Sequence, residues 1–138
     1  MNKVLLGFGA FAFGLLFVLT HVTLNTSQSM PIGLYRITHS PFQRGALVLL
    51  KDPLKQIVAV PGDTVQWGMD GVYVNGTLLR NSGIPARSPY PPYPHMRLKL
   101  ADGQYLMMAG NPLSYDGRYT GPIPESLIAS TVQPLWIR

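Results

Sequence analysis

An uncharged apolar run near the N-terminus constrains the fold of this chain more than any other feature. From residue 4 to residue 20 no position is charged, and most are leucine, phenylalanine, valine, alanine or glycine. About 17 to 21 such residues in a helix would span roughly 26 to 31 Å, close to one hydrocarbon core of a bilayer. Lys3 precedes the run, so the positive-inside rule predicts a cytoplasmic N-terminus. We therefore expect residues 1–24 to form a transmembrane anchor and residues 25–138 to form an extracytoplasmic domain.

A cleaved secretory signal is the main alternative for this segment. Ala10-Phe11-Ala12 has the small-x-small form of a cleavage site. Cleavage there would leave an apolar stretch of about six residues, which is shorter than the roughly 7 that such a signal needs. An uncleaved anchor is therefore the better prediction.

The composition excludes several kinds of site. Because the 138 residues include no cysteine, the chain has no disulfide, no thiolate metal site and no cysteine nucleophile. The three histidines, at positions 21, 39 and 95, lie too far apart for an HExxH-type metal site. The net charge is +5, but the lysines and arginines are scattered, which indicates a basic surface rather than a nucleic-acid site. We expect no metal, no cofactor and no nucleic-acid partner.

Beyond residue 24, short apolar runs alternate with turn residues, which is typical of an all-β domain. Asp70-Gly71 and Asn75-Gly76 each separate two such runs, and the second pair has the spacing of a type I′ hairpin. Residues 84–95 contain five prolines and should form an extended loop, because proline cannot donate a hydrogen bond to a sheet. These signals predict a mainly β domain, either a barrel or a pair of small sheets. The predicted strands are 34–38, 46–50, 56–60, 64–67, 72–74, 77–79, 97–100, 105–108 and 132–137, with a short helix or another strand at 125–130.

Ser29 lies in the first of three segments with candidate chemistry, Ser27-Gln28-Ser29-Met30-Pro31-Ile32-Gly33-Leu34-Tyr35. It follows the expected membrane exit by a few residues. Pro31 restricts φ and Gly33 permits close approach of another backbone, so this segment would present Ser29 on a rigid bend. A polar linker without function is the alternative.

Lys55 opens the second segment, Lys55-Gln56-Ile57-Val58-Ala59-Val60-Pro61-Gly62-Asp63. Burial of an ammonium group is unfavourable, so it would lower the lysine pKa from its usual value near 10.4. A neutral amine could accept the proton of a serine hydroxyl, as in serine peptidases that use a Ser–Lys pair. The alternative is a lysine at a strand end whose amine reaches solvent. Lys51 is the nearest rival base.

The third segment, Gly110-Asn111-Pro112-Leu113-Ser114-Tyr115-Asp116-Gly117-Arg118-Tyr119, has the composition of a loop. Asp116 and Arg118 could form an ion pair that holds the loop in shape, and Ser114 could hydrogen-bond the lysine amine. A surface loop with a solvated ion pair, which contributes little to stability, is the alternative.

The three segments, in this order along the chain, resemble motifs of the bacterial type I signal peptidases. The matching motifs are Ser-Met-Pro, Lys-x5-Pro-Gly-Asp and Ser-x-Asp-x-Arg-Tyr. The string Asn-Thr-Ser-Gln-Ser-Met-Pro-Ile-Gly-Leu-Tyr-Arg is most similar to their conjugal-transfer (TraF-like) branch, whose members process the pilin of plasmid mating systems. The match covers residues 25–121. The resemblance implies a mainly β fold, namely a signal-peptidase-like (LexA-like) β-barrel core with one N-terminal transmembrane helix. Given its length, we expect a minimal catalytic core without the large second β domain of many signal peptidases.

The resemblance also implies the catalytic roles. Ser29 corresponds to the nucleophile and Lys55 to the general base of a Ser–Lys dyad. Ser27 corresponds to the serine whose hydroxyl forms the oxyanion hole together with the backbone amide of Ser29. No metal or cofactor takes part in this chemistry.

Three supporting residues follow from the same resemblance. Ser114 corresponds to the serine that hydrogen-bonds the lysine, and Asp116 and Arg118 correspond to the supporting ion pair. In some members of the transfer branch the aspartate is regarded as catalytic. The chain departs from the family pattern at Ala109-Gly110-Asn111, Gln56 and Gly117.

The implied function is that of a membrane-anchored serine endopeptidase that cleaves a signal or pro-peptide from exported precursors. The expected substrate is a membrane-bound, pilin-like precursor. Water would resolve the acyl-enzyme and give a linear product, or the N-terminus of the substrate would attack it and give a cyclic peptide. We expect a monomer in the inner membrane with a single span, in contact with the lipid bilayer, and with its catalytic domain on the periplasmic or extracellular side. A general type I signal peptidase and a non-catalytic, membrane-tethered β module of a secretion complex are the alternatives. Four side chains belong either to a lipid-facing surface or to the core, namely Trp67, Met107, Met108 and Trp136.

Overall fold

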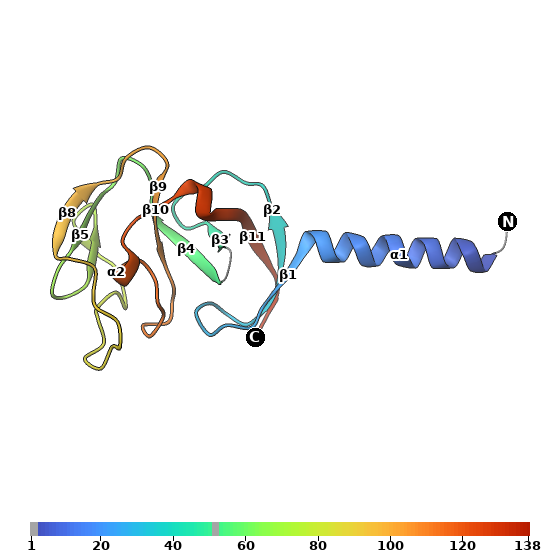
Figure 1. Cartoon of the computed structure of the whole chain (residues 1–138), viewed down its shortest axis with the longest axis horizontal. Coiled ribbons are helices and arrows are strands. Elements are labelled where there is room, and N and C mark those ends of the chain that lie inside the picture. Colours follow the sequence, from blue (N-terminus) through green and yellow to red (C-terminus); the bar gives the residue numbers. More distant parts are fainter. Residues whose placement is uncertain (1–2, 51–52) are drawn as a thin grey trace.

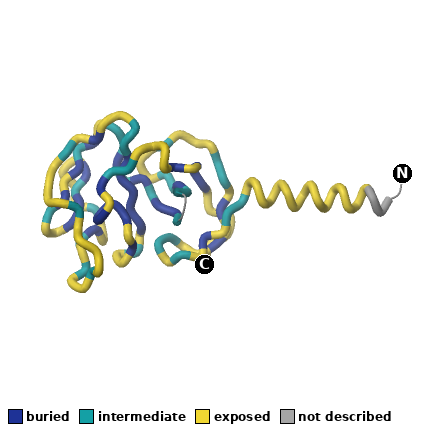
Figure 2. Tube along the Cα trace, viewed as in Figure 1, coloured by how far each residue is buried: buried dark blue, intermediate teal, exposed yellow. Residues whose placement is uncertain are grey.

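The N-terminal apolar run forms a helix that projects away from the rest of the molecule (Figure 1). The computed structural model describes residues 3–50 and 53–138, and the side chains of the first helix from residue 6 onward. Helix α1 extends over Lys3–His21, and from Leu6 to His21 its side chains are exposed (Figure 2). Across the described residues, none of the helices meets the length and hydropathy criteria for spanning a membrane.

The chain leaves the helix three residues before the predicted end of the anchor. Strand β1 takes up Val22–Asn25 and pairs antiparallel with β2. Val22 and Thr23 are β-branched, which favours a strand once a pairing partner is present.

The rest of the chain is mainly β, as predicted. The strands are β1 Val22–Asn25, β2 Gly33–Thr38, β3 Leu47–Leu50, β4 Leu54–Ala59, β5 Thr64–Trp67, β6 Val72–Val74, β7 Thr77–Leu78, β8 Met96–Lys99, β9 Gln104–Met108, β10 Ile123–Pro124 and β11 Ile128–Ile137. The short helix α2 covers Gly117–Thr120, and a 3₁₀ turn, η1, covers Glu125–Leu127 just before β11. The segment 125–130 therefore contains both of the structures expected as alternatives.

The strands form two antiparallel sheets. One has the order β1-β2-β11-β3-β4-β9-β10 and the other the order β7-β6-β5-β8. In the first sheet β1 and β10 are the two edges, so hydrogen bonds among the described strands form an open sheet rather than a closed barrel. Of the two predicted arrangements, the pair of sheets is the one observed. Strand β4 and strand β5 are joined by a short turn, which links the first sheet directly to the second.

Both predicted hairpins are confirmed. Val74 pairs with Thr77, and the two residues between them, Asn75 and Gly76, have φ values of 50° and 83°. Positive φ at both central positions defines a type I′ turn.

The residues from 84 to 95 contain no strand or helix, in agreement with the proline-rich loop prediction.

Three groups of buried apolar side chains make up the core. Trp67 and Met108 belong to the group between the two sheets, and Met107 belongs to a second group around Val48 and Ile57. These three of the four candidate lipid-facing residues are therefore core residues. Trp136 differs, because its side chain is 60% exposed near the end of β11.

Candidate active site

Ser29 lies in the loop that joins β1 to β2. Asn25 pairs with Gly33, so residues 26–32 form the connection. Ser29 is in a turn of this loop and is half-buried. A Cβ atom on Gly33 would collide with the backbone carbonyl of Trp136, as expected for a glycine at a close backbone approach. The predicted bend is confirmed, and the role of Ser29 as nucleophile stays a prediction.

Asn25 organises this loop, and sequence analysis missed it. Its buried side-chain amide donates hydrogen bonds to the carbonyls of Ser27, Met30 and Pro31 at 3.0 to 3.1 Å. The backbone N–H of Ser27 donates to Asn25 Oδ1 at 3.2 Å, which is an Asx turn. An asparagine two residues before a serine was the only sequence signal for this arrangement.

The hydroxyl of Ser27, the predicted oxyanion donor, has a partner already. Its Oγ donates to Asn25 Oδ1 at 3.0 Å. A hydroxyl carries a single proton, so Ser27 would have to rotate away from Asn25 before it could donate to an oxyanion.

Lys55 is the second residue of β4 and lies opposite Val48 of β3. Because side chains alternate along a strand, Lys55 shares a face with the core residue Ile57. Lys55 is only 4% exposed. Burial lowers its pKa below 10.5, the negative charge of Asp116 opposes this change, and the positive charge of Arg118 adds to it. This environment agrees with the prediction of a desolvated lysine rather than one whose amine extends into solvent.

Ser114 connects the third segment to the Ser29 loop. Its Oγ donates a hydrogen bond to Ser29 Oγ at 3.0 Å, although the two residues are 85 positions apart. The family resemblance implied a hydrogen bond to the lysine instead. Since its one proton is donated to Ser29, the Ser114 hydroxyl could engage the Lys55 amine only as an acceptor.

Asp116 and Arg118 form a buried ion pair with a distance of 2.6 Å between Oδ2 and Nη2, and both side chains are 0% exposed. Asp116 also caps helix α2 and accepts a hydrogen bond from the backbone N–H of Ala109. Arg118 donates to three backbone carbonyls, those of Asn81, Asn111 and Pro112. The interpretation of this pair as a solvated surface contact is therefore wrong. The pair fixes the shape of the loop that carries Ser114.

A second hydrogen bond joins the same two loops. The side-chain amide of Asn111 donates to the backbone carbonyl of Gln28 at 3.2 Å. Asn111 and Ala109 both belong to the stretch where the chain departs from the usual family pattern. Both nevertheless take part in holding the loop, so the departure does not disrupt it.

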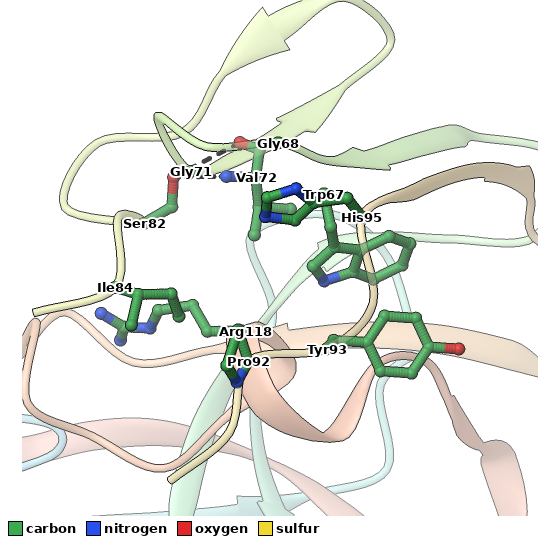
Figure 3. A pocket seen from close by; sticks show the side chains of 10 residues that line it. All are labelled: Trp67, Gly68, Gly71, Val72, Ser82, Ile84, Pro92, Tyr93, His95 and Arg118. Carbon is green, nitrogen blue, oxygen red and sulfur yellow. Dashed lines mark hydrogen bonds between the residues drawn. The ribbon is translucent and has the colours of Figure 1, made fainter. Parts of the chain in front are cut away.

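Two cavities lie near these residues. One, of about 230 Å³, is lined by residues 23–27 together with Leu49, Pro53 and Leu54, and so adjoins Ser27. The other is enclosed between Arg118, Trp67 and Tyr93 (Figure 3) and has a volume of only about 10 Å³. A space of that size holds at most one water molecule and is not a substrate site.

The structure thus places Ser29 and Ser114 in contact and buries Lys55, Asp116 and Arg118. The Ser29 hydroxyl lies on a hydrogen-bonded turn and accepts a hydrogen bond from Ser114. Asp116 and Arg118, in the same loop as Ser114, act electrostatically on the buried Lys55, whose pKa is lowered by burial. No group of three histidine, aspartate or glutamate side chains within residues 3–50 and 53–138 is placed to hold a metal ion. Lys51, the rival base, lies outside the described residues.

Comparison with known proteins gives the family. The model of the family described as "Signal peptidase, peptidase S26" matches residues 2–136. The chain belongs to the signal peptidase family. It is therefore a serine peptidase of the signal peptidase I type, and its substrate class is a precursor protein.

Within the signal peptidase family, the relatives indicate the branch. Two plasmid transfer proteins TraF from Escherichia coli are 29% and 31% identical, each over 81% of this chain and over 81% and 80% of their own lengths. A probable signal peptidase I-2 from Synechocystis sp. is 36% identical over 60% of this chain and 38% of its own length. A solved signal peptidase I from Enterococcus faecalis has 18% sequence identity and a TM-score of 0.48, and the match covers 70% of this chain and 100% of that one. The chain belongs to the TraF-like branch of this family.

Proposed function

We propose that this signal peptidase is a membrane-anchored endopeptidase in which Ser29 is the nucleophile and Lys55 the general base. The position of one loop, residues 110–119, supports the proposal. Ser114 donates to Ser29, and Asp116 and Arg118, in the same loop, act electrostatically on the buried Lys55. The loop thus connects the hydroxyl to a buried lysine whose pKa is lowered by burial.

The proposed reaction begins with proton transfer from Ser29 to the neutral amine of Lys55. The Ser29 oxygen attacks the scissile carbonyl, and the Ser29 backbone amide and the rotated hydroxyl of Ser27 stabilise the oxyanion. One such donor is typically worth about 3 to 4 kcal/mol. The protonated lysine then gives its proton to the leaving amine, and an acyl-enzyme remains. The 230 Å³ cavity beside Ser27, whose lining includes Leu49 and Leu54, is the proposed site for a small side chain next to the scissile bond.

The anchor is the second part of the proposal. Helix α1 exposes five phenylalanine and valine side chains and several leucines to the surroundings, with no apolar partner in the β domain for most of its length (Figure 2). Burial of such a surface in lipid is strongly favourable. We place the N-terminus in the cytoplasm, α1 in the inner membrane and residues 25–138 outside it, with Ser29 a few residues from the bilayer surface.

The proposed substrate is a membrane-bound, pilin-like precursor of a conjugative system. The two relatives named as plasmid transfer proteins support this choice. The acyl-enzyme would be resolved by water, which releases a linear product, or by the N-terminal amine of the substrate, which cyclises it. The similarity to a probable signal peptidase I-2 supports general precursor processing as the second candidate function.

The test combines purified full-length enzyme in detergent or vesicles with a pilin-like precursor of a conjugative system and, separately, with an unrelated secretory precursor. Ser29→Ala and Lys55→Ala should each lower cleavage by about 1,000-fold or more. Lys99→Ala is the matched control, because Lys99 is an exposed lysine in the other sheet. Mass spectrometry of the product termini separates hydrolysis from cyclisation.

Wild-type cleavage by either variant would end the dyad proposal. Equal processing of both precursors would favour the general signal peptidase. Absence of cleavage by the folded wild-type enzyme with both precursors would favour the non-catalytic β module.

A further inference from the structure

Asn25 makes more hydrogen bonds to the Ser29 loop than any other described side chain. The two hydrogens of Nδ2 point to three carbonyls, those of Ser27, Met30 and Pro31, at 3.1, 3.0 and 3.0 Å. Its Oδ1 accepts from the N–H of Ser27 at 3.2 Å and from the Ser27 hydroxyl at 3.0 Å. One amide thus contacts both ends of the turn that contains Ser29.

The assignment of the two amide atoms is set by their surroundings. Exchange of Nδ2 and Oδ1 would put an oxygen against three carbonyl oxygens and a nitrogen donor against a backbone N–H. Asn25 is only 6% exposed, so water cannot readily replace these bonds.

A second buried side chain makes a hydrogen bond to the same loop. The hydroxyl of Tyr35 donates to the carbonyl of Pro31 at 2.6 Å, and Tyr35 is 1% exposed. The Pro31 carbonyl therefore accepts from both Asn25 and Tyr35. Asn25 and Tyr35 thus hold residues 26–32 together with the contacts from Asn111 and Ser114.

We propose that Asn25 is a positioning residue of the peptidase reaction. Its amide closes the loop over residues 26–32 and so keeps the Ser29 hydroxyl in line with Ser114 and the Ser29 amide in place for the oxyanion. Asn25 is also one of the residues that line the cavity beside Ser27, but it acts on the reacting atoms only through Ser29 and Ser27. The inference rests on the proposed role of Ser29 as nucleophile.

The test uses Asn25→Asp in the full-length enzyme, with Asn25→Ala beside it. Aspartate keeps the size of the side chain and its Oδ1 acceptor. It replaces the Nδ2 donor with an oxygen, which would face the three carbonyl oxygens that Nδ2 now contacts. Small displacements of reacting groups can cost about 100-fold in rate, so we expect kcat to fall about 10- to 100-fold. We expect KM to change less than about 3-fold and the pH dependence set by Lys55 to stay where it is, because the substitution keeps the size of the side chain in the cavity lining and leaves Leu49, Leu54 and Lys55 unchanged.

Three further variants make the result decisive. Gln28→Ala, which removes an exposed side chain of the same loop, should leave kcat unchanged. Tyr35→Phe removes only the hydroxyl bound to Pro31 and should lower kcat by about 3- to 10-fold even if both Asn25 variants fold poorly. Ser29→Ala is measured in the same assay. The inference would be overturned if Ser29→Ala were inactive while folded Asn25→Asp and Tyr35→Phe both kept the wild-type kcat; the proposed function would then still stand. An active Ser29→Ala enzyme would overturn the proposed function itself.

Discussion

Lys55 is the residue whose environment matters most for the proposed chemistry. An ordinary lysine is almost fully protonated at neutral pH and cannot act as a base. Burial lowers the pKa of Lys55, and the nearby charges act in opposite directions, with Asp116 raising the pKa and Arg118 lowering it. The buried Asp116–Arg118 pair therefore influences the pKa of Lys55 as well as the shape of the loop.

The pH dependence of cleavage should report on this lysine. Because the neutral amine is the active form, kcat/KM should rise with pH through one ionisation that lies below 10.5. Lys55→Arg should be inactive at every pH, since guanidinium stays protonated. The measurement is a pH–rate profile of the full-length enzyme. A profile that is flat from acid to alkaline pH would contradict the role of Lys55 as base.

Asp116→Asn separates a catalytic aspartate from a supporting one. Asparagine leaves Arg118 buried without its counter-charge, so we expect a loss of about 3 to 5 kcal/mol in the free energy of unfolding. Removal of the negative charge also removes the influence that raises the pKa of Lys55. The rising limb of the pH–rate profile should therefore move to lower pH in the folded fraction. If activity vanished while the free energy of unfolding was unchanged, Asp116 would be catalytic rather than supporting.

At the scale of elements, the turn between β4 and β5 aligns the two sheets. Asp63 lies at this turn and accepts hydrogen bonds from Arg44 at 2.6 Å, from the Val60 N–H at 2.9 Å and from Asn75 at 2.8 Å. Burial alone would raise the pKa of Asp63, but these hydrogen bonds and the charge of Arg44 lower it below 3.8. One carboxylate thus joins the end of β4, the start of β5 and the β6–β7 hairpin.

Asp63→Asn should weaken this connection in a pH-dependent way. The folded-state pKa is lower than the unfolded-state value, so the stabilisation is present above about pH 3.8 and is lost as pH falls through the folded-state pKa. At pH 7 we expect the variant to lose about 1 to 3 kcal/mol, and at pH 2 we expect the difference to shrink. Urea unfolding at the two pH values measures both quantities. A difference that grew on acidification would contradict this account.

At the scale of the whole molecule, an exposed apolar row lies across three strands beside helix α1. Leu34 of β2 pairs with Leu24 of β1 on one side and with Trp136 of β11 on the other, and all three side chains are exposed. Because α1 leads directly into β1, this row lies near the point where the proposed anchor would meet the bilayer surface (Figure 1). Tryptophan favours the membrane interface.

Tryptophan fluorescence in vesicles with brominated lipids tests this arrangement. Bromine quenches only indoles that reach the lipid, so the emission of Trp136 should be quenched while that of the buried Trp67 should not. Trp136→Phe should abolish the quenching, and Trp67→Phe should retain it. Equal emission in brominated and ordinary lipid would show that the row faces water.

The amino-acid sequence by itself determined the local elements. The apolar runs from residue 34 onward, the Asn75-Gly76 turn and the prolines of residues 84–95 depend on near neighbours in the chain, and each was predicted as the type of element observed. Strand β1, Val22–Asn25, was missed, because its first three residues were assigned to the anchor. The three motifs around Ser29, Lys55 and Ser114 were likewise sufficient for the family. Short elements such as α2 and β10 were missed because they are too brief for a periodic pattern and depend on the Asp116 cap and on pairing with β9.

Only the tertiary structure decided how these pieces meet. The hydrogen bond between Ser29 and Ser114 joins residues 85 positions apart, and no local signal encodes such a distance. The burial of Lys55 and of the Asp116–Arg118 pair depends on which strands and loops pack over them, as do the carbonyls that surround Asn25. Burial and long-range hydrogen bonds are properties of the packed chain, whereas turns and strands are properties of short segments, and this difference separates what the sequence predicted from what the fold added.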